Sequence, residues 1–234
     1  MTAGSRHISK RYTCITADIR CFGRSAARLT EFQWPQLLQD VQRLLEQEKI
    51  ERVAIVGQSL GGMIGLRMAL AHPALVAGFI ASDTSLSIDH PEMLQRIRDR
   101  QITQKAVTVE QRSLGRWFLE NEPEKAALYA QINHFNPSAH SLPPEQWGQA
   151  LADMMRPDAL LPMDVLGDVK CPTLFVVGSE DPIVPVSAMQ EAAELVADSS
   201  VAVVQDAGHS AYSEKPAEYN KLALSFLERC VYPR

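Results

Sequence analysis

Residues 53–70 read VAIVGQSLGGMIGLRMAL, a stretch that places Ser59 between a predicted strand and a predicted helix. The strand is Val53 to Val56, a continuous apolar run typical of parallel strands that are buried on both faces. The helix runs from Gly62 to His72, where apolar residues recur at helical spacing. A serine at such a junction lies on a sharp, strained turn that exposes its hydroxyl group. Ser59 is therefore the predicted nucleophile.

The same serine is the centre of a Gly-x-Ser-x-Gly pattern formed by Gly57, Ser59 and Gly61. Both glycines are expected where neighbouring backbone passes too close to the turn for a side chain. The pattern is short and also occurs by chance. The strand before it and the helix after it make the prediction of a nucleophile much more specific.

A serine hydroxyl becomes a good nucleophile only when a base removes its proton, so a histidine and an orienting carboxylate are expected. Thr173–Val177 has the pattern of a second buried strand, and the loop after it carries Asp181. Val201–Val204 predicts a third strand, and its loop carries His209. All three side chains thus follow the carboxyl ends of predicted parallel strands, the edge where such sheets bind ligands. Ser59, Asp181 and His209 form the predicted catalytic set.

With these residues in this order, nearly the whole chain resembles the α/β-hydrolase family. The segment DIRCFGRS, residues 18–25, looks like that family's Asp-x-Arg-Gly-x-Gly-x-Ser loop, with Cys21 where a glycine is usual. The resemblance implies an α/β fold with a mostly parallel, doubly wound sheet. It also implies hydrolysis without a metal or an organic cofactor.

Other residues could take the roles predicted for Asp181 and His209. Asp181 stands at the family's usual place for the acid, but Glu180 is its neighbour. Some members of the family take the acid from the end of the preceding strand, where this chain has Asp83. His209 is the expected base because the other histidines lie near the terminus, at a helix end or in the variable middle: His7, His72, His90, His134 and His140.

The resemblance also implies two backbone N–H donors for the oxyanion, of which Leu60 supplies one. In the family the other comes from a His-Gly loop within about 50 residues ahead of the Asp-x-Arg loop. Here 17 residues precede Asp18. In the family's sheet a third strand lies between the strand predicted here at Tyr12–Ala17 and the elbow strand, Val53–Val56. The residues before Asp18 are too few to include it, so we expect a gap or a rearranged pairing at that place. Unless residues 2–5 rebuild this region, we expect the chain to be a slow esterase that melts below about 60 °C.

Alternating strands and helices predict a parallel sheet with helices on both faces. The remaining predictions are a strand at Val76–Ala81 and helices at Trp34–Glu48, 91–105, 108–120, 123–132, 144–155, Ser187–Val196 and Ala217–Cys230. The alternation breaks in the middle of the chain. Residues 1–85 and 166–234 are therefore the expected hydrolase core, and residues 86–165 the expected helical lid.

The predicted lid carries four large aromatic side chains, Trp117, Phe118, Phe135 and Trp147. Most are expected to pack within the lid or against the core, and a minority to line the pocket. We expect Trp117 and Trp147 to contact substrate, together with Gln58 beside the nucleophile.

Composition favours a soluble enzyme of one domain with an insertion. The 234 residues are 46% hydrophobic and 22% charged, enough to fill a sizeable core. A net charge of −5 argues against nucleic acid or an anionic membrane as partner. The four cysteines are scattered without metal-ligand spacing, and no apolar run reaches membrane length. Without a signal peptide at the N-terminus, the expected location is the cytoplasm.

The short strings GQSLGGMIG, SDT and HPEM are similar to the 3-oxoadipate enol-lactonase and small-ester hydrolase branch of the family. That similarity implies hydrolysis of a small carboxylic ester or lactone through an acyl-enzyme on Ser59. Two alternatives remain open at this point. One is a hydrolase-like protein with little or no turnover, because the second oxyanion donor is missing. The other is a carbon–carbon bond hydrolase.

Overall fold

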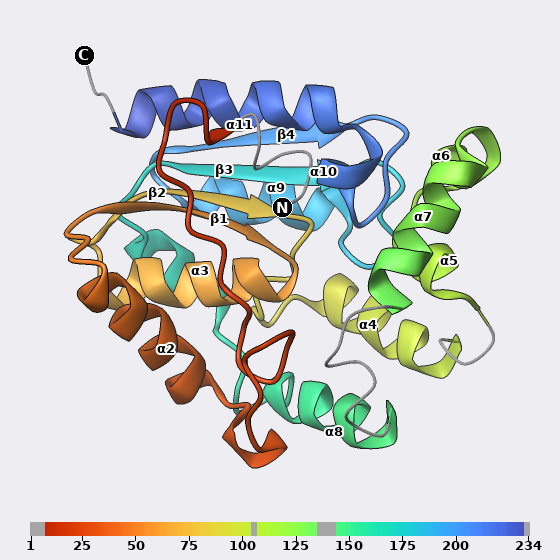
Figure 1. The fold of residues 1–234 in the computed structure, drawn as a ribbon, viewed down its shortest axis with the longest axis horizontal. Helices are drawn as coiled ribbons and strands as arrows, with labels where there is room; N and C mark the ends of the chain where they lie inside the picture. The colour runs from red at the N-terminus through yellow and green to blue at the C-terminus, as the bar shows by residue number, and fades with distance from the viewer. Residues whose placement is uncertain (1–7, 104–106, 135–143, 232–234) are drawn as a thin grey trace.

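The computed structural model describes residues 8–103, 107–134 and 144–231 (Figure 1). Its centre is a parallel four-stranded sheet in the order β1-β2-β3-β4. The strands are β1 (Val53–Gln58), β2 (Val76–Ser82), β3 (Thr173–Gly178) and β4 (Ser199–Val204). Strands β2 and β3 are buried along their whole length, as expected of central strands in a parallel sheet. The predicted α/β class with a parallel sheet is confirmed.

Helices cover both faces of the sheet (Figure 1). On one face, Phe79 and Phe175 pack against α3 (Leu60–Ala71), α9 (Val186–Leu195) and, further out, α2 (Trp34–Gln47). On the other face, Ile80 and Val176 pack against α11 (Pro216–Val231). Successive residues of a strand point to opposite faces, so each central strand contributes to both hydrophobic clusters.

The chain between β2 and β3 forms helices that lie at one end of the sheet (Figure 1). They are α4 (Pro91–Thr103), α5 (Val109–Ser113), α6 (Arg116–Asn121), α7 (Pro123–His134) and α8 (Pro144–Met154). We call them the helical insertion. A parallel bridge between Ile88 and Leu161 joins the two connections that lead into and out of it. The division into core and lid stays a prediction.

The single helix predicted at 108–120 is wrong, because the chain breaks there into α5 and α6. Leu114 and Gly115 between the two helices have extended backbone angles. The N–H of Gly115 donates to the buried side chain of Glu214 at 2.8 Å, a partner that lies 99 positions further along the chain. A distant hydrogen-bond partner thus ends the helix at a point that local pattern does not mark.

The strand predicted at Tyr12–Ala17 is also wrong. Residues 13–18 are exposed and belong to no strand. Of the two expected outcomes, a gap or a rearranged pairing, the described structure therefore has the gap beside the elbow strand. The expectation that Val53–Val56 is buried on both faces fails for the same reason. In the described sheet β1 is an edge strand, and Val56 is 44% exposed.

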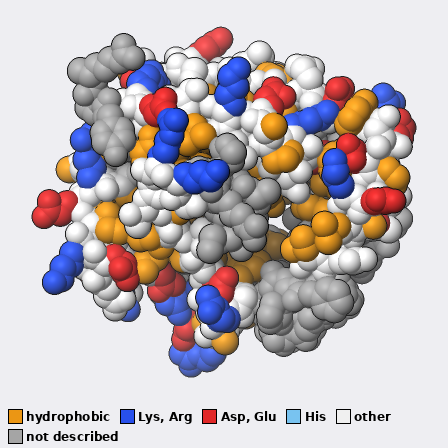
Figure 2. Space-filling view, turned by 45° about the horizontal axis from the view of Figure 1, so that its top comes forward, with side chains coloured by type: hydrophobic (Ala, Val, Ile, Leu, Met, Phe, Trp, Pro, Cys, Tyr) orange, Lys and Arg blue, Asp and Glu red, His pale blue; other side chains and the backbone are white. Residues whose placement is uncertain are grey.

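The surface mixes charges of both signs, as Figure 2 shows for one face, where hydrophobic patches lie among acidic and basic side chains. Within the described part of the chain, no helix combines the length and the apolar character needed to cross a membrane.

Glycine permits one close approach at the turn after β1. A Cβ atom on Gly57 would lie 2.4 Å from the carbonyl oxygen of Gly61. A Cβ on Gly62 would lie 2.5 Å from the Thr84 side chain, whereas one on Gly61 would meet nothing within 4 Å. The prediction that crowding excludes a side chain therefore holds at Gly57 and fails at Gly61, whose own backbone is the obstacle.

This crowding predicts the effect of two glycine substitutions. Gly57→Ala should lower the free energy of unfolding by about 1–3 kcal/mol, because the obstacle is backbone that cannot rotate away. Gly148→Ala on α8 should raise it by about 0.5–1 kcal/mol, since a Cβ there meets nothing and alanine favours helix. Urea unfolding of both variants tests this, and a Gly57→Ala variant as stable as wild type would contradict the inferred clash.

Candidate active site

Ser59 lies on the turn from β1 into α3 with φ 50° and ψ −116°, a strained conformation for a residue with a side chain. Two hydrogen bonds from the neighbouring strand hold it there. Its N–H donates to the carbonyl oxygen of Ser82 at 3.0 Å, and the Thr84 hydroxyl donates to its carbonyl oxygen at 2.7 Å. The predicted strained turn is thus present, and the end of β2 supports it.

The structure brings Ser59, His209 and Asp181 together from three strand ends. The Oγ of Ser59 lies 3.1 Å from Nε2 of His209, and Nδ1 of His209 lies 2.9 Å from Oδ2 of Asp181. Asp181 and His209 are almost fully buried, whereas Ser59 is partly exposed. Both distances are within normal hydrogen-bond range. A continuous relay therefore links a buried carboxylate to an accessible hydroxyl.

The carboxylate of Asp181 is fixed by its own loop. Its Oδ1 accepts the N–H groups of Ile183 at 2.7 Å and Val184 at 3.0 Å, which leaves Oδ2 for the imidazole. The guanidinium of Arg96 on α4 donates to the Asp181 carbonyl oxygen at 3.3 Å. Backbone donors and a cation thus set the orientation of this acid.

Burial and two nearby carboxyl groups set the pKa of His209, the predicted base. Burial lowers the pKa of His209, but the nearby carboxyl groups of Asp181 and Asp83 raise it by more, so its pKa lies above the ordinary value. A raised pKa favours the imidazolium, the form that a general base reaches after it takes a proton.

Asp83, one rival acid, lies behind this relay. Its Oδ1 accepts the N–H of Gly178 at 3.0 Å, and its Oδ2 accepts the Ser82 hydroxyl at 2.9 Å and the N–H of Ala211 at 3.3 Å. Burial, followed by repulsion from Asp181, raises the pKa of Asp83 to about 7. The hydrogen bond to the imidazole is made by Asp181, so the geometry favours Asp181 as the orienting group.

The other rivals point elsewhere. Oε2 of Glu180 accepts the N–H of Trp117 at 2.8 Å and so faces α6. Nε2 of His90 lies 3.1 Å from a carboxylate oxygen of Glu191 on α9, away from the serine. The predictions for His7, His140 and the side chain of His134 fall outside the described residues.

The remaining predicted site residues lie as follows. Leu60 is the first residue of α3, where a backbone N–H has no partner within the helix. The amide of Gln58 donates to the carbonyl oxygen of His209 at 2.7 Å, so this side chain links the nucleophile strand to the base. The ring of Trp117 lies 3.6 Å from Nζ of Lys215. The side chain of Trp147 lies outside the described residues, as does Phe135.

Sequence reasoning missed Glu214. This side chain is 5% exposed and accepts the N–H groups of Gly208 at 2.9 Å and Ser210 at 3.1 Å, on either side of His209. Its sequence context, SEKP, is polar and has the pattern of an exposed helix start. Only the fold of the loop reveals that this carboxylate points inward.

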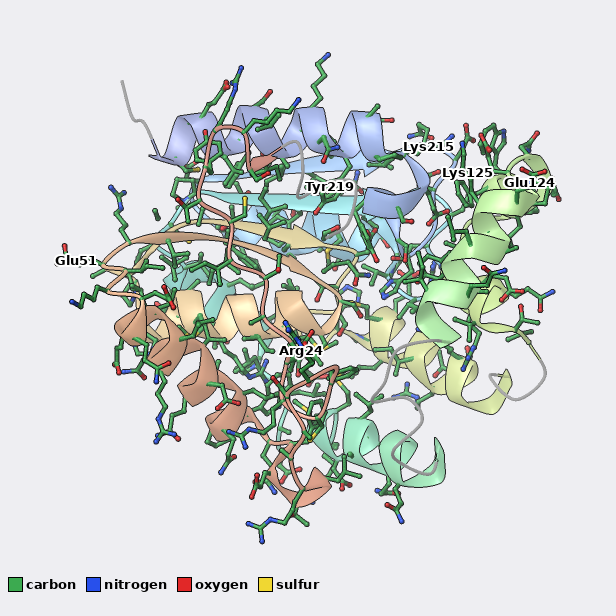
Figure 3. All side chains as sticks on the ribbon, in the orientation of Figure 1. Arg24, Glu51, Glu124, Lys125, Lys215 and Tyr219 are labelled. Atoms are coloured by element: carbon green, nitrogen blue, oxygen red, sulfur yellow. The ribbon has the colours of Figure 1, made fainter. Side chains whose placement is uncertain are left out.

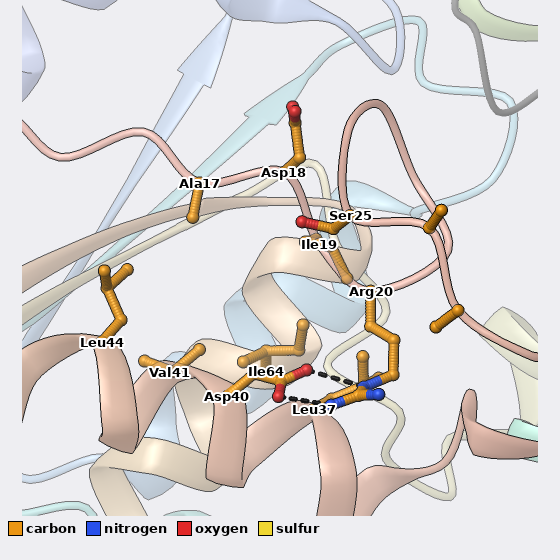
Figure 4. A pocket seen from close by; sticks show the side chains of 12 residues that line it. Ala17, Asp18, Ile19, Arg20, Ser25, Leu37, Asp40, Val41, Leu44 and Ile64 are labelled. Carbon is orange, nitrogen blue, oxygen red and sulfur yellow. Dashed lines mark hydrogen bonds and ion pairs between the residues drawn. The ribbon is translucent and has the colours of Figure 1, made fainter.

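A cavity of about 350 Å³ lies apart from this relay, between the segment 17–27 and helices α2 and α3 (Figure 4). Ala17, Leu44 and Ile64 are among its lining residues, and none of the three relay residues lines it. Arg20 makes a two-pronged ion pair with Asp40 across it, at 2.6 and 2.8 Å. This pair joins the Asp-x-Arg loop to α2.

The left-handed backbone at Cys21, with φ 69°, explains why a glycine is usual at that place in the Asp-x-Arg loop. Gly23 in the same loop has φ 52°, and a Cβ there would lie 2.5 Å from the Asp18 side chain. The loop therefore keeps its turn with one glycine and one strained cysteine.

Comparison with known proteins bears on this arrangement. Residues 4–216 match the family model described as alpha/beta hydrolase fold. RutD from Yersinia enterocolitica, named for carbamate hydrolysis, is 28% identical over 94% of this chain and 79% of its own length. The 3-oxoadipate enol-lactonase 2 of Acinetobacter baylyi is 25% identical over 95% of this chain and 81% of its own. A thermophilic esterase from Thermogutta terrifontis superposes with a TM-score of 0.77 at 25% identity, over 97% of this chain and 84% of that structure.

A parallel sheet between helices, with a serine on a strained turn at the strand ends, defines an enzyme of the hydrolase class. The chain belongs to the α/β-hydrolase fold family, as its match over residues 4–216 shows. The resemblance inferred from residues 18–25 and from the Ser59 pattern is confirmed.

The burial of Asp83 predicts a pH effect on stability. Its folded-state pKa of about 7 exceeds the ordinary value of 3.8, so the folded chain keeps a proton that the unfolded chain releases in that interval. The contribution of this carboxyl to stability therefore falls as the pH rises from about 4 to 7. Asp83→Asn removes this contribution, so its stability relative to wild type should rise between about pH 4 and pH 7.

Urea unfolding at several pH values measures this difference. Asp89→Asn removes an exposed carboxyl group and is the matched control. If the difference for Asp83→Asn changes with pH no more than that for Asp89→Asn, the raised pKa of Asp83 is wrong.

Proposed function

We propose that this protein is a serine hydrolase that cleaves a small carboxylic ester or lactone through an acyl-enzyme on Ser59. The observation that carries the proposal is the relay from Ser59 through His209 to Asp181, with distances of 3.1 and 2.9 Å. The enol-lactonase and esterase relatives support these two substrate classes. A carbamate is the next candidate, because RutD is named for that substrate.

The geometry supports the following steps. His209 takes the hydroxyl proton through Nε2 as Oγ of Ser59 attacks the carbonyl carbon, and the carbonyl oxygen becomes an oxyanion. Asp181 holds the proton of Nδ1 and stabilises the imidazolium. Collapse of the tetrahedral intermediate breaks the bond to the leaving alkoxide or enolate, which takes the proton from His209. Water then attacks the acyl group with His209 again as base, and Ser59 is released.

The N–H of Leu60 at the start of α3 is the proposed donor to the oxyanion. Loss of one donor from such a pair typically costs about 10²–10³-fold in turnover. In the described sheet β1 is an edge strand, and in the family the second donor follows a strand at that edge. A slow or non-hydrolytic protein is therefore the alternative to this proposal.

The role of Ser59 predicts the behaviour of Ser59→Ala. The variant should lose nearly all hydrolysis of a short-chain ester, and labelling by a fluorophosphonate, because Ser59 supplies the hydroxyl that contacts Nε2 of His209. Its melting temperature should stay close to that of wild type. Ser225→Ala, at an exposed position on α11, should keep both activities. Wild-type ester hydrolysis by Ser59→Ala would overturn the proposed function.

The role of Asp181 predicts a ranking of two aspartate variants. Asp181→Asn should lower kcat by about 10²–10⁴-fold, because the amide would hold the imidazole in the wrong tautomer. Asp83→Asn should cost less than about tenfold, since Asp83 contacts backbone and Ser82 rather than the imidazole. Steady-state ester hydrolysis measures both values, and the reverse order would move the acid to Asp83.

A further inference from the structure

The helical insertion rests directly on the loop that carries His209. The N–H of His209 donates to the carbonyl oxygen of Ser113 at the end of α5, at 2.7 Å. Gly208 and Gly115 also lie so close that a Cβ atom on Gly208 would be 2.3 Å from the nitrogen of Gly115. Two glycines from distant parts of the chain therefore let two backbones touch beside the base.

Glu214 joins these two backbones. One carboxylate oxygen, Oε2, accepts the N–H of Gly208 at 2.9 Å and the N–H of Gly115 at 2.8 Å. The other oxygen, Oε1, accepts the N–H of Ser210 at 3.1 Å. The carboxylate thus holds the residue before His209, the residue after it and the turn between α5 and α6.

Three converging N–H donors call for a carboxylate. Glutamine has one acceptor oxygen, so its NH₂ group would face at least one of these N–H groups. Burial raises the pKa of Glu214, and the three N–H donors oppose that shift. Hydrogen bonds to a charged acceptor are the stronger kind, so this site contributes more to loop order than neutral bonds would.

Glu180 provides an internal comparison. It also anchors the insertion, because its Oε2 accepts the N–H of Trp117 at 2.8 Å. Among the described residues one N–H group donates to this carboxylate, and a glutamine oxygen can accept it equally well.

A second contact joins the insertion to the chain after Glu214. Nζ of Lys215 lies 3.6 Å from the centre of the Trp117 ring. Figure 3 places Lys215 on the side of the molecule where Glu124 and Lys125 of α7 lie.

We propose that Glu214 is a positioning residue that keeps His209 aligned with Ser59 and couples this alignment to the seating of the α5–α6 turn. The proposal rests on the proposed serine hydrolase function and adds a link between the insertion and the base. Displacement of about 1 Å at a reacting group can cost about 10²-fold in rate, so small shifts of this loop matter.

The test compares Glu214→Gln with Glu180→Gln. Turnover is measured per active site, counted by fluorophosphonate titration, so that unfolded protein does not enter the rate. Glu214→Gln should lower kcat about 10- to 100-fold with KM within about threefold of wild type. Glu180→Gln should leave both constants within about twofold. A third variant, Gly115→Ala, places a Cβ atom 2.8 Å from the nitrogen of Gly208 and so forces the α5–α6 turn and the His209 loop apart. It should lower kcat in the same way as Glu214→Gln.

A second readout is independent of turnover. In ¹⁵N-histidine spectra, with the His209 signals assigned by their loss in His209→Gln, the pKa of His209 should fall in Glu214→Gln and Gly115→Ala. The reason is that both changes loosen its contact with Asp181, which raises this pKa. Glu180→Gln should leave it unchanged. Gly115→Ala carries this test if Glu214→Gln does not fold.

The outcomes separate the two proposals. If the His209 titration of Glu214→Gln or Gly115→Ala superimposes on that of wild type, or Glu180→Gln shifts it equally, the positioning role is wrong. If the titration shifts as expected and wild type hydrolyses no ester and takes no fluorophosphonate, the positioning role stands and the proposed function fails.

Discussion

The close approach of Gly57 to Gly61 is the constraint on which the arrangement of the site depends. A Cβ atom on Gly57 would lie 2.4 Å from the carbonyl oxygen of Gly61, so the chain reverses direction in very few residues. This reversal puts Ser59 in a left-handed conformation and starts α3 directly after it. Because α3 then packs back on β1 and β2, the serine stays at the strand ends, where the loops after β3 and β4 also arrive.

Carboxylates hold the loops around this turn. Asp83, Asp181 and Glu214 are each buried, and each accepts at least two backbone N–H groups. An ionised carboxylate loses several kcal/mol of hydration when buried, and a hydrogen bond to a charged group returns about 1.5–3 kcal/mol. Two or three such bonds are therefore needed at each site. These carboxyl groups thus connect the loops that carry Asp181 and His209 to the rest of the fold.

Features set by neighbouring residues could be predicted from the sequence, whereas features set by contacts between distant residues could not. Ser59, Asp181 and His209 were predictable because each stands just after a short apolar strand, a pattern confined to a few residues. The break at Gly115 and the buried position of Glu214 depend on a contact between residues 99 positions apart. Local propensity favours a continuous helix through Gly115 and an exposed side chain at Glu214. The hydrogen bond between these two residues overrides both preferences.

At Tyr12–Ala17 the local pattern predicts a strand that the structure does not form. Its residues suit a strand, but a strand needs a hydrogen-bonding neighbour, and in the described sheet β1 has none on that side. In the described structure the elbow is held from the end of β2 and from the loop after β4. The N–H of Ser59 donates to the carbonyl oxygen of Ser82, the Thr84 hydroxyl donates to that of Ser59, and the Gln58 amide donates to that of His209. Because these contacts suffice to form the relay, the alignment of nucleophile and base does not depend on the open edge. In the proposed mechanism this edge affects the oxyanion instead, because the turn offers the N–H of Leu60 and the family takes its second donor from a loop after a strand at that edge.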